Sequence, residues 1–266
     1  MTSTGGFAVD MAARHASTGE WSPMLEVNAW GSTEGRKKLP KKHEWCRINV
    51  DQFESSGPCD AFQLAIRYWP GGAPEVSQLI VCTRDDSVAA QKDTQFAACH
   101  VDVPFRSQQT EDPAIASRIC SPTSVSMVLE HFGVHQPIAD IAQILHDPDE
   151  KIYGNWARAV QCAFEMGLAG HIESFENLHS AEQLLHDDQP LIISIRSEEG
   201  DIVNAPYGQT SGHLLVLTGI DRNGDFRVND PAAATAKQGV ATYTREAIYK
   251  TWIVNGGVAY VLYPRL

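Results

Sequence analysis

The chain has 266 residues, of which 43% are hydrophobic and 20% are charged, and its formal net charge is -12 at pH 7. These values are typical of a folded globular protein of one or two domains. The acidic balance argues against nucleic acid or an anionic membrane as the main partner. The sequence contains no run of about 18 apolar residues, so we expect no transmembrane helix.

The first 20 residues are small and polar, which predicts a loosely held arm. They lack the basic and apolar regions of a signal peptide, so we expect a cytoplasmic protein, or a secreted one if the chain is a trimmed mature form. The cysteines are scattered and form no C-x-x-C pair, which argues against zinc, and we expect no cofactor. Free thiols are the default expectation, with one or two disulfides among the first four as the alternative: Cys46, Cys59, Cys82, Cys99, Cys120 and Cys162.

The next part of the chain, up to about residue 83, has the character of β-strands. Phe62, Leu64, Ile66 and Tyr68 alternate with more polar residues, as in a strand with one apolar face. No segment here has a helical pattern, so we predict a small all-β, sandwich-like module over residues 1–95. Residues 85–92 are charged or small and suit a linker, so a second domain is expected over 96–266. The strands are expected at 24–30, 47–51, 61–69 and 78–83.

The second domain begins with a cysteine at the start of a helix. Apolar residues at Val125, Val128, Leu129 and Phe132 share one helical face, and Pro122 and Gly133 suit the first turn and the end of that helix. Cys120 therefore lies at or just before a helix N-terminus, where free N–H groups and the helix dipole stabilise an anion. A thiolate in this position is a competent nucleophile, although a single cysteine is more often a buried structural residue.

The pattern that follows predicts helices and then an antiparallel sheet, which is the organisation of an α+β domain. Apolar spacing predicts two more helices, beginning at Pro137 and near Trp156, and a fourth with a capping box at Ser180. A buried strand is expected over 190–195 and a long polar loop over 197–212. Further strands are expected over 213–220, 226–230 and 258–263.

A predicted hairpin places a histidine and an aspartate close together. Asn223-Gly224 is typical of a tight turn, and the two flanking strands carry His213 at the start of one and Asp230 at the end of the other. A cross-strand or diagonal contact lets the carboxylate orient the imidazole, which then acts as a base for Cys120. Asn229 is the weaker candidate for this orienting role. A helix-start Cys followed by such a His and Asp is the order found in papain-like thiol enzymes.

An acyl-transfer site of this kind also needs hydrogen-bond donors for an oxyanion. The Cys120 backbone N–H can supply one donor, and a side-chain amide must supply another. Gln108 and Gln109 lie on the segment that leads to the helix, and we favour Gln108 over Gln109.

Several short motifs in residues 100–264 occur in a matching order. They are Val103-Pro104 with Ser107-Gln108, Cys120-Ser121-Pro122-Thr123-Ser124, Gly212-His213 with Thr218-Gly219-Ile220-Asp221, and Val228-Asn229-Asp230-Pro231. Together they resemble the bacteriocin-processing (double-glycine leader) peptidase-like family, which belongs to the papain-like cysteine peptidases. The resemblance implies Cys120 as nucleophile, His213 as general base, Asp230 as the orienting residue and Gln108 as oxyanion donor. The motifs Trp21-Ser22-Pro23 and Trp30-Gly31, with the 60–67 strand, look like the β module that precedes this domain in some bacterial members.

Two features depart from the family pattern. The family usually has Gly directly after the nucleophile, whereas this chain has Ser121, whose side chain is expected to crowd the approach to the cysteine. The sequence also lacks the transporter domains of bacteriocin exporters, so we do not expect leader processing during export.

The leading hypothesis is a cysteine peptidase that acts on a peptide or protein substrate, with neither nucleic acid nor a membrane as partner. A second hypothesis keeps the acyl-enzyme and changes its acceptor, which gives a deamidase or an acyl transferase such as a transglutaminase. A third is a catalytically inactive binding protein on a peptidase fold, with the β module as the working part.

Overall fold

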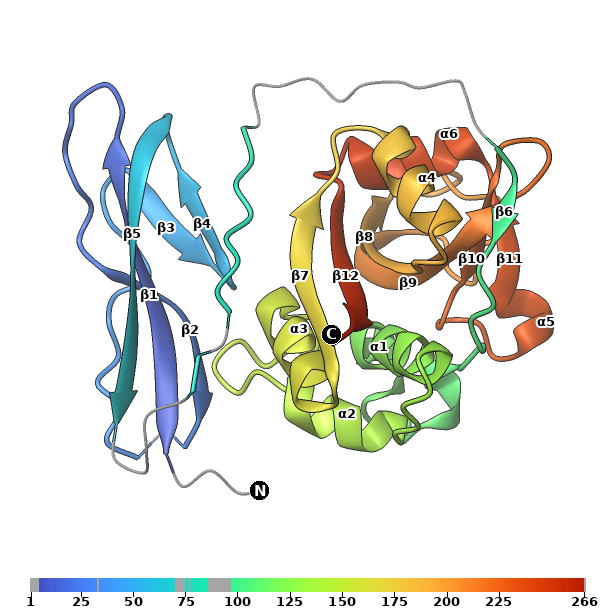
Figure 1. The fold of residues 1–266 in the computed structure, drawn as a ribbon, viewed down its shortest axis with the longest axis horizontal. Helices are drawn as coiled ribbons and strands as arrows, with labels where there is room; N and C mark the ends of the chain where they lie inside the picture. The colour runs from blue at the N-terminus through green and yellow to red at the C-terminus, as the bar shows by residue number, and fades with distance from the viewer. Residues whose placement is uncertain (1–4, 33, 70–74, 77, 86–96, 266) are drawn as a thin grey trace. The chain divides into compact units, whose positions relative to one another are not determined.

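The computed structural model describes residues 5–32, 34–69, 75–76, 78–85 and 97–265, and the chain divides into two compact units, 1–79 and 80–266 (Figure 1). The linker expected over 85–92 lies, apart from Asp85, outside the described residues. Each unit has its own buried clusters and is described separately.

The N-terminal unit is an antiparallel β structure, as the sequence predicts. One sheet has the strand order β2-β1-β5, and a hairpin of β3 and β4 forms a second, two-stranded sheet. Every pairing in the unit is antiparallel. The strands are β1 (Gly6–His15), β2 (Leu25–Gly31), β3 (Cys46–Asn49), β4 (Gln52–Ser55) and β5 (Cys59–Trp69).

Two expectations for this part of the chain are wrong. The N-terminal arm is instead the central strand β1, in which Ala8 and Ala12 are buried while Phe7 stacks on Trp30 with ring centroids 4.9 Å apart. The small residues on the buried face gave a weak alternation that concealed the strand. The strand expected over 78–83 does not form, and Leu79 and Ile80 are 50% and 44% exposed because no sheet covers them within the described residues.

A buried ionic cluster joins the three strands β1, β2 and β5 of the N-terminal sheet. Asp10 and Glu26 are almost completely enclosed, and Arg67 donates to Asp10 Oδ1 at 3.0 Å and to Glu26 Oε2 at 2.8 Å. Arg36 also pairs with Glu26. Burial by itself raises the pKa of Glu26, but the hydrogen bonds and charges of Arg36 and Arg67 lower it overall. The Glu26 carboxylate is therefore stabilised as an anion inside the sheet by its two guanidinium partners.

The C-terminal unit is an α+β domain, as predicted. Its antiparallel sheet has the order β11-β10-β9-β8-β12-β7, with β6 paired to β9. Its strands are β6 (Cys99–His100), β7 (Leu168–Ser174), β8 (Leu191–Ser197), β9 (Thr210–Ile220), β10 (Phe226–Asn229), β11 (Val240–Tyr243) and β12 (Val258–Pro264). Its helices are η1 (Gln108–Thr110), η2 (Ala116–Arg118), α1 (Cys120–His131), α2 (Ile138–Leu145), α3 (Trp156–Glu165), α4 (Leu178–His186), α5 (Ala236–Gly239), α6 (Arg245–Ile248) and the π-helical turn η3 (Tyr249–Ile253).

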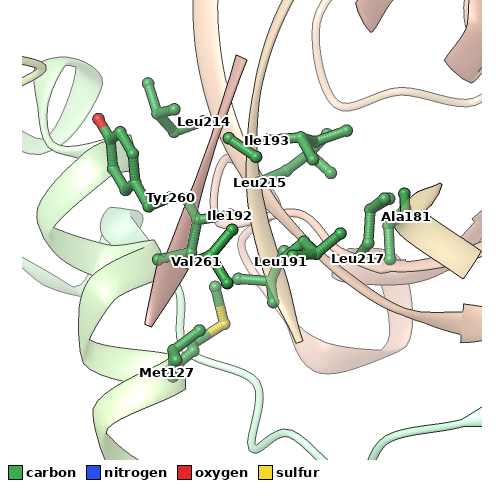
Figure 2. Packing of buried hydrophobic residues seen from close by; sticks show 14 of the residues in the cluster. Met127, Ala181, Leu191, Ile192, Ile193, Leu214, Leu215, Leu217, Tyr260 and Val261 are labelled. Carbon is green, nitrogen blue, oxygen red and sulfur yellow. The ribbon is translucent and has the colours of Figure 1, made fainter. Parts of the chain in front are cut away.

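One continuous core joins the helices to this sheet. Helix α1 packs on β9, and α3 packs on β7 and β12, while α4 contacts β6, β8 and β9. Figure 2 shows Met127 of α1 on one side of the strands and Ala181 of α4 on the other, with Leu191 and Val261 between them. Because both sides of the central strands are covered, those strands are almost wholly apolar, as the run Leu214–Leu217 illustrates.

The four predicted helices, α1 to α4, begin and end close to the predicted positions, with one exception, whereas α5, α6 and the three η helices were not predicted. Helix α1 ends before Gly133, whose φ of 80° is the left-handed conformation of a helix C-terminal glycine. The capping box expected at Ser180 is wrong, because α4 begins at Leu178 and Asn177 caps it by accepting the Ser180 N–H at 3.0 Å. Asn is among the strongest N-cap residues and lies three positions earlier in the chain.

Two further sequence expectations concern thiols and membrane segments. All six cysteines lie within the described residues and are free, so the alternative of disulfides among the first four does not hold. Among the described helices, none combines the length and the apolar character needed to cross a membrane.

Candidate active site

Cys120, the predicted nucleophile, is the first residue of α1, as the sequence led us to expect. No side chain caps this end of the helix, and Pro122 lies in the first turn, where its missing N–H costs no hydrogen bond. The backbone N–H groups of Ser121 and Leu214 instead help to lower the pKa of the thiol. The residue is partly exposed, in contrast to the buried turn that follows it. Cys120 thus combines access to solvent with donors that stabilise a thiolate.

His213 lies on β9 and is nearly buried. The strand begins at Thr210 and not at His213 as expected, so the histidine is held within the sheet, opposite Ile195 of β8. Ser124 of α1 donates to the Leu214 carbonyl at 3.2 Å, which fixes the start of the helix against this strand. The ring interacts with Cys120, which helps to raise the pKa of the imidazole, and its Nε2 lies 2.8 Å from Asp230 Oδ1. Because Nε2 is engaged by Asp230, the other ring nitrogen of His213, Nδ1, is the one available to the Cys120 thiol.

Asp230 follows β10 and is completely buried. The predicted turn forms, with the Asp221 N–H donating to the Asp225 carbonyl at 2.8 Å and Gly224 at a φ of 87°. Beyond the strand, the Asp230 N–H donates to the Gly239 carbonyl at 2.9 Å, so the backbone holds the carboxylate in place. A buried carboxylate needs such partners to remain charged.

The three side chains form one electrostatic unit. Burial alone raises the pKa of Cys120, but its hydrogen bond and charge interaction with His213, with the two backbone donors, lower it overall. Burial alone lowers the pKa of His213, whereas the charge and hydrogen bond of Asp230 and the contact with Cys120 raise it to about 10. Burial also opposes ionisation of Asp230, yet His213 and the hydrogen-bond donors lower its pKa. The arrangement favours a thiolate–imidazolium pair beside a charged carboxylate.

Ser121 does not lie where it would crowd the cysteine. Its side chain is fully buried, and its hydroxyl lies 3.2 Å from the hydroxyl of Tyr260, which is itself in the core. The side chain therefore points into the protein and away from solvent. The crowding expected from Ser in place of Gly is wrong for this reason.

The two glutamines and Asn229 have different surroundings. Gln108 is buried, its backbone N–H donates to the Pro231 carbonyl at 2.9 Å, and within the described part of the chain its Oε1 has no hydrogen-bond partner. Gln109 is exposed, and its side-chain amide donates to the Ala232 carbonyl at 3.3 Å. Asn229 is buried and donates to the Val103 carbonyl at 2.8 Å, so its amide is engaged away from His213.

Sequence reasoning missed two tyrosines that contact Asp230. The hydroxyls of Tyr207 and Tyr243 donate to its Oδ2 at 3.0 and 2.8 Å. Tyr243 belongs to β11, a short strand that was not predicted. Tyr207 lies in the long loop before β9, and the length of that loop was the only sequence signal for a role.

The geometry can be compared with known proteins. The model of the Peptidase_C39 like family matches residues 100–260, which is more than half of the chain. A search of curated proteins gave no match.

Similar solved structures include a double glycine motif protease from an AMS/PCAT transporter in complex with its leader peptide (18% identity, 64% of this chain, 100% of that chain, TM-score 0.43). A second is a C39-like peptidase from Bacillus anthracis (17% identity, 64% of this chain, 98% of that chain, TM-score 0.49). A third is the peptidase domain of Streptococcus ComA (20% identity, 56% of this chain, 93% of that chain, TM-score 0.40). The extent of the family match settles the relationship, and the chain belongs to the C39-like peptidase family.

Proposed function

We propose that this protein is a cysteine peptidase that hydrolyses peptide bonds through an acyl-enzyme on Cys120. The observation that carries the proposal is His213, whose Nε2 lies 2.8 Å from Asp230 Oδ1 and which lies near enough to Cys120 for each to shift the pKa of the other. Membership of a peptidase family supports this reaction class and a peptide substrate. No observation on this chain favours deamidation or transfer over hydrolysis.

In the proposed mechanism the Cys120 thiolate attacks the carbonyl carbon of the scissile peptide bond, and a C–S bond forms as the carbonyl π electrons move to oxygen. His213, as imidazolium, then gives its proton to the leaving amine nitrogen, and the C–N bond breaks to leave a thioester. His213, now neutral, takes a proton from the water that attacks the thioester. That attack releases the acid product and restores the thiolate–imidazolium pair. Asp230 keeps the ring oriented and stabilises its positive charge.

The oxyanion formed in both steps needs donors that are already in place. The backbone N–H of Cys120 and the side-chain amide of Gln108 have this role in the proposal. Gln108 is supported over Gln109 because it is buried and because its backbone N–H donates to the carbonyl of Pro231, the residue after Asp230. The Gln109 amide already donates to the protein backbone.

The test is digestion of a peptide library derived from a denatured proteome, with mass spectrometry of the new termini and the Cys120→Ala variant as control. The proposal predicts new termini with a restricted set of flanking residues in the wild type and none in the variant. A mass gain of about 1 Da, or cross-linked peptides, in place of cleavage would replace hydrolysis by deamidation or transfer. If the library stays intact and a thiol-directed acyl probe fails to label Cys120, the chain is a binding protein on a peptidase fold.

A further inference from the structure

The Asp230 carboxylate accepts more hydrogen bonds than its contact with His213 alone requires. Oδ1 receives His213 Nε2 at 2.8 Å and the Ala232 backbone N–H at 3.0 Å. Oδ2 receives both tyrosine hydroxyls, Tyr243 at 2.8 Å and Tyr207 at 3.0 Å. Because the carboxylate has no exposed surface, water cannot replace a donor that is lost. Each tyrosine hydroxyl therefore helps to stabilise the negative charge of Asp230 beside His213.

The two tyrosines come from different kinds of element. Tyr243 is the last residue of β11, paired with Phe226 of β10, and is almost completely buried. Tyr207 lies in the 198–209 loop, which connects β8 to β9 and whose residues are mostly exposed. One donor is thus fixed by the sheet, and the other depends on where the loop lies.

Tyr207 also contacts His213, the hydrogen-bond partner of Asp230. Its ring meets the His213 ring edge-on, with centroids 4.8 Å apart and an angle of 63° between the planes. One side chain of the loop thus covers the imidazole and hydrogen-bonds the carboxylate. Burial and the charge of Asp230 raise the pKa of Tyr207, so its hydroxyl keeps its proton and remains a donor.

The other fixed point of the loop lies several residues earlier. Asp201 pairs with Lys250 of η3 at 2.6 Å and accepts the Glu198 N–H at 2.9 Å, and Ile202 is buried in the core. Between this point and Tyr207 the chain is mostly exposed, with Val203 71% accessible, and only Ala205 packs against the core. Tyr207 is therefore the contact that joins the exposed end of the loop to the site.

We propose that Tyr207 is a positioning residue that couples docking of the 198–209 loop to the charge state of the Asp230–His213 pair. The inference rests on the proposed function of that pair. With the loop docked, Asp230 has its complete set of donors and the imidazole is covered. With the loop released, Oδ2 keeps Tyr243 as its only hydroxyl donor, so the carboxylate takes up a proton more readily and stabilises the imidazolium less. A peptide that contacts the loop would then influence the reactivity of Cys120.

The test measures alkylation of Cys120 by iodoacetamide against pH, together with amide hydrogen exchange in the loop, on the full chain. It compares Tyr207→Phe and Tyr243→Phe, each of which removes one hydroxyl and keeps the ring. Tyr263→Phe is the matched control, since Tyr263 lies on β12 and its ring contacts His171. Alkylation needs no peptide substrate, so the result does not depend on whether the chain cleaves peptides.

Both site variants should move the acid limb of the alkylation profile to higher pH, with the rate near pH 5 falling about 10-fold or more. Tyr207→Phe should also speed hydrogen exchange in the loop, by about 5-fold or more, and Tyr243→Phe should do so less, because Tyr243 belongs to β11 and reaches the loop only through the Tyr207 hydroxyl. Tyr263→Phe should change neither. An unshifted acid limb in Tyr207→Phe, or unchanged exchange in its loop, overturns the proposal. If the acid limb shifts in Tyr207→Phe but the wild-type protein cleaves no library peptide, the positioning role of Tyr207 stands and the peptidase function is rejected.

Discussion

Removing the charge of Asp230 should abolish the special reactivity of Cys120. In the wild type, the surroundings raise the pKa of His213 from 6.5 to about 10, with Asp230 as the main cause that opposes burial. This rise corresponds to roughly 5 kcal/mol in favour of the imidazolium. In Asp230→Asn the ring remains buried without its carboxylate, so it becomes neutral near pH 7. Cys120 then loses the cation that lowers its pKa, while the burial that raises it remains.

The assay is the pH dependence of alkylation by iodoacetamide, followed for each cysteine by peptide mass spectrometry. The thiolate fraction of an ordinary thiol with a pKa of about 8.5 falls roughly 75-fold between pH 8 and pH 6. For Cys120 of the wild type, the rate should fall by less than about 5-fold over that range. In Asp230→Asn it should fall at least as steeply as for an ordinary thiol.

Cys59 provides an internal reference, because it is exposed and belongs to the N-terminal unit. For each cysteine we compare the pH ratio, which is the alkylation rate at pH 8 divided by that at pH 6. This ratio, unlike the absolute rate, does not depend on how accessible each sulfur is. The reasoning is refuted if Cys120 and Cys59 of the wild type have the same pH ratio, or if Asp230→Asn leaves the Cys120 ratio unchanged.

Two further predictions concern stability. Glu26→Ala leaves the cluster of Asp10, Arg36 and Arg67 with uncompensated buried charge, so denaturant unfolding should show a free energy of unfolding lower by about 3–5 kcal/mol. Removal of the exposed Arg14–Asp60 pair should have little effect, and equal effects of the two changes would contradict the account. Ser121→Gly should lower the free energy of unfolding by about 1–2 kcal/mol and leave Cys120 alkylation within about twofold, because the hydroxyl contacts Tyr260; markedly faster alkylation would show that Ser121 does obstruct the cysteine.

The sequence was most informative where a local pattern determines the structure. Helix α1 follows from the apolar spacing after Cys120 and from Gly133, and the strand pair that carries the histidine and aspartate follows from Asn223-Gly224. These signals come from backbone geometry and amphipathic periodicity, which act over a few residues. The α+β class of the second unit could be predicted for the same reason.

The parts that were missed depend on partners far away in the chain. β1 contains small residues that become a strand only when β2 and β5 pair with it, whereas residues 78–83 have a strand-like composition but no paired strand among the described residues. The orientation of Ser121 is set by Tyr260, and the donors to Asp230 come from Tyr207 and Tyr243. No short-range pattern reports such contacts, because they are made by packing of the complete sheet.

The most direct test of the central claim is to trap the covalent intermediate. A peptide that the library identifies as cleaved is mixed with the wild-type chain, quenched in acid within milliseconds to seconds and analysed by mass spectrometry. The account predicts a thioester between Cys120 and the acyl half of the peptide, with none in Cys120→Ala. Continued cleavage by Cys120→Ala, or a thioester on another of the six cysteines, would contradict it.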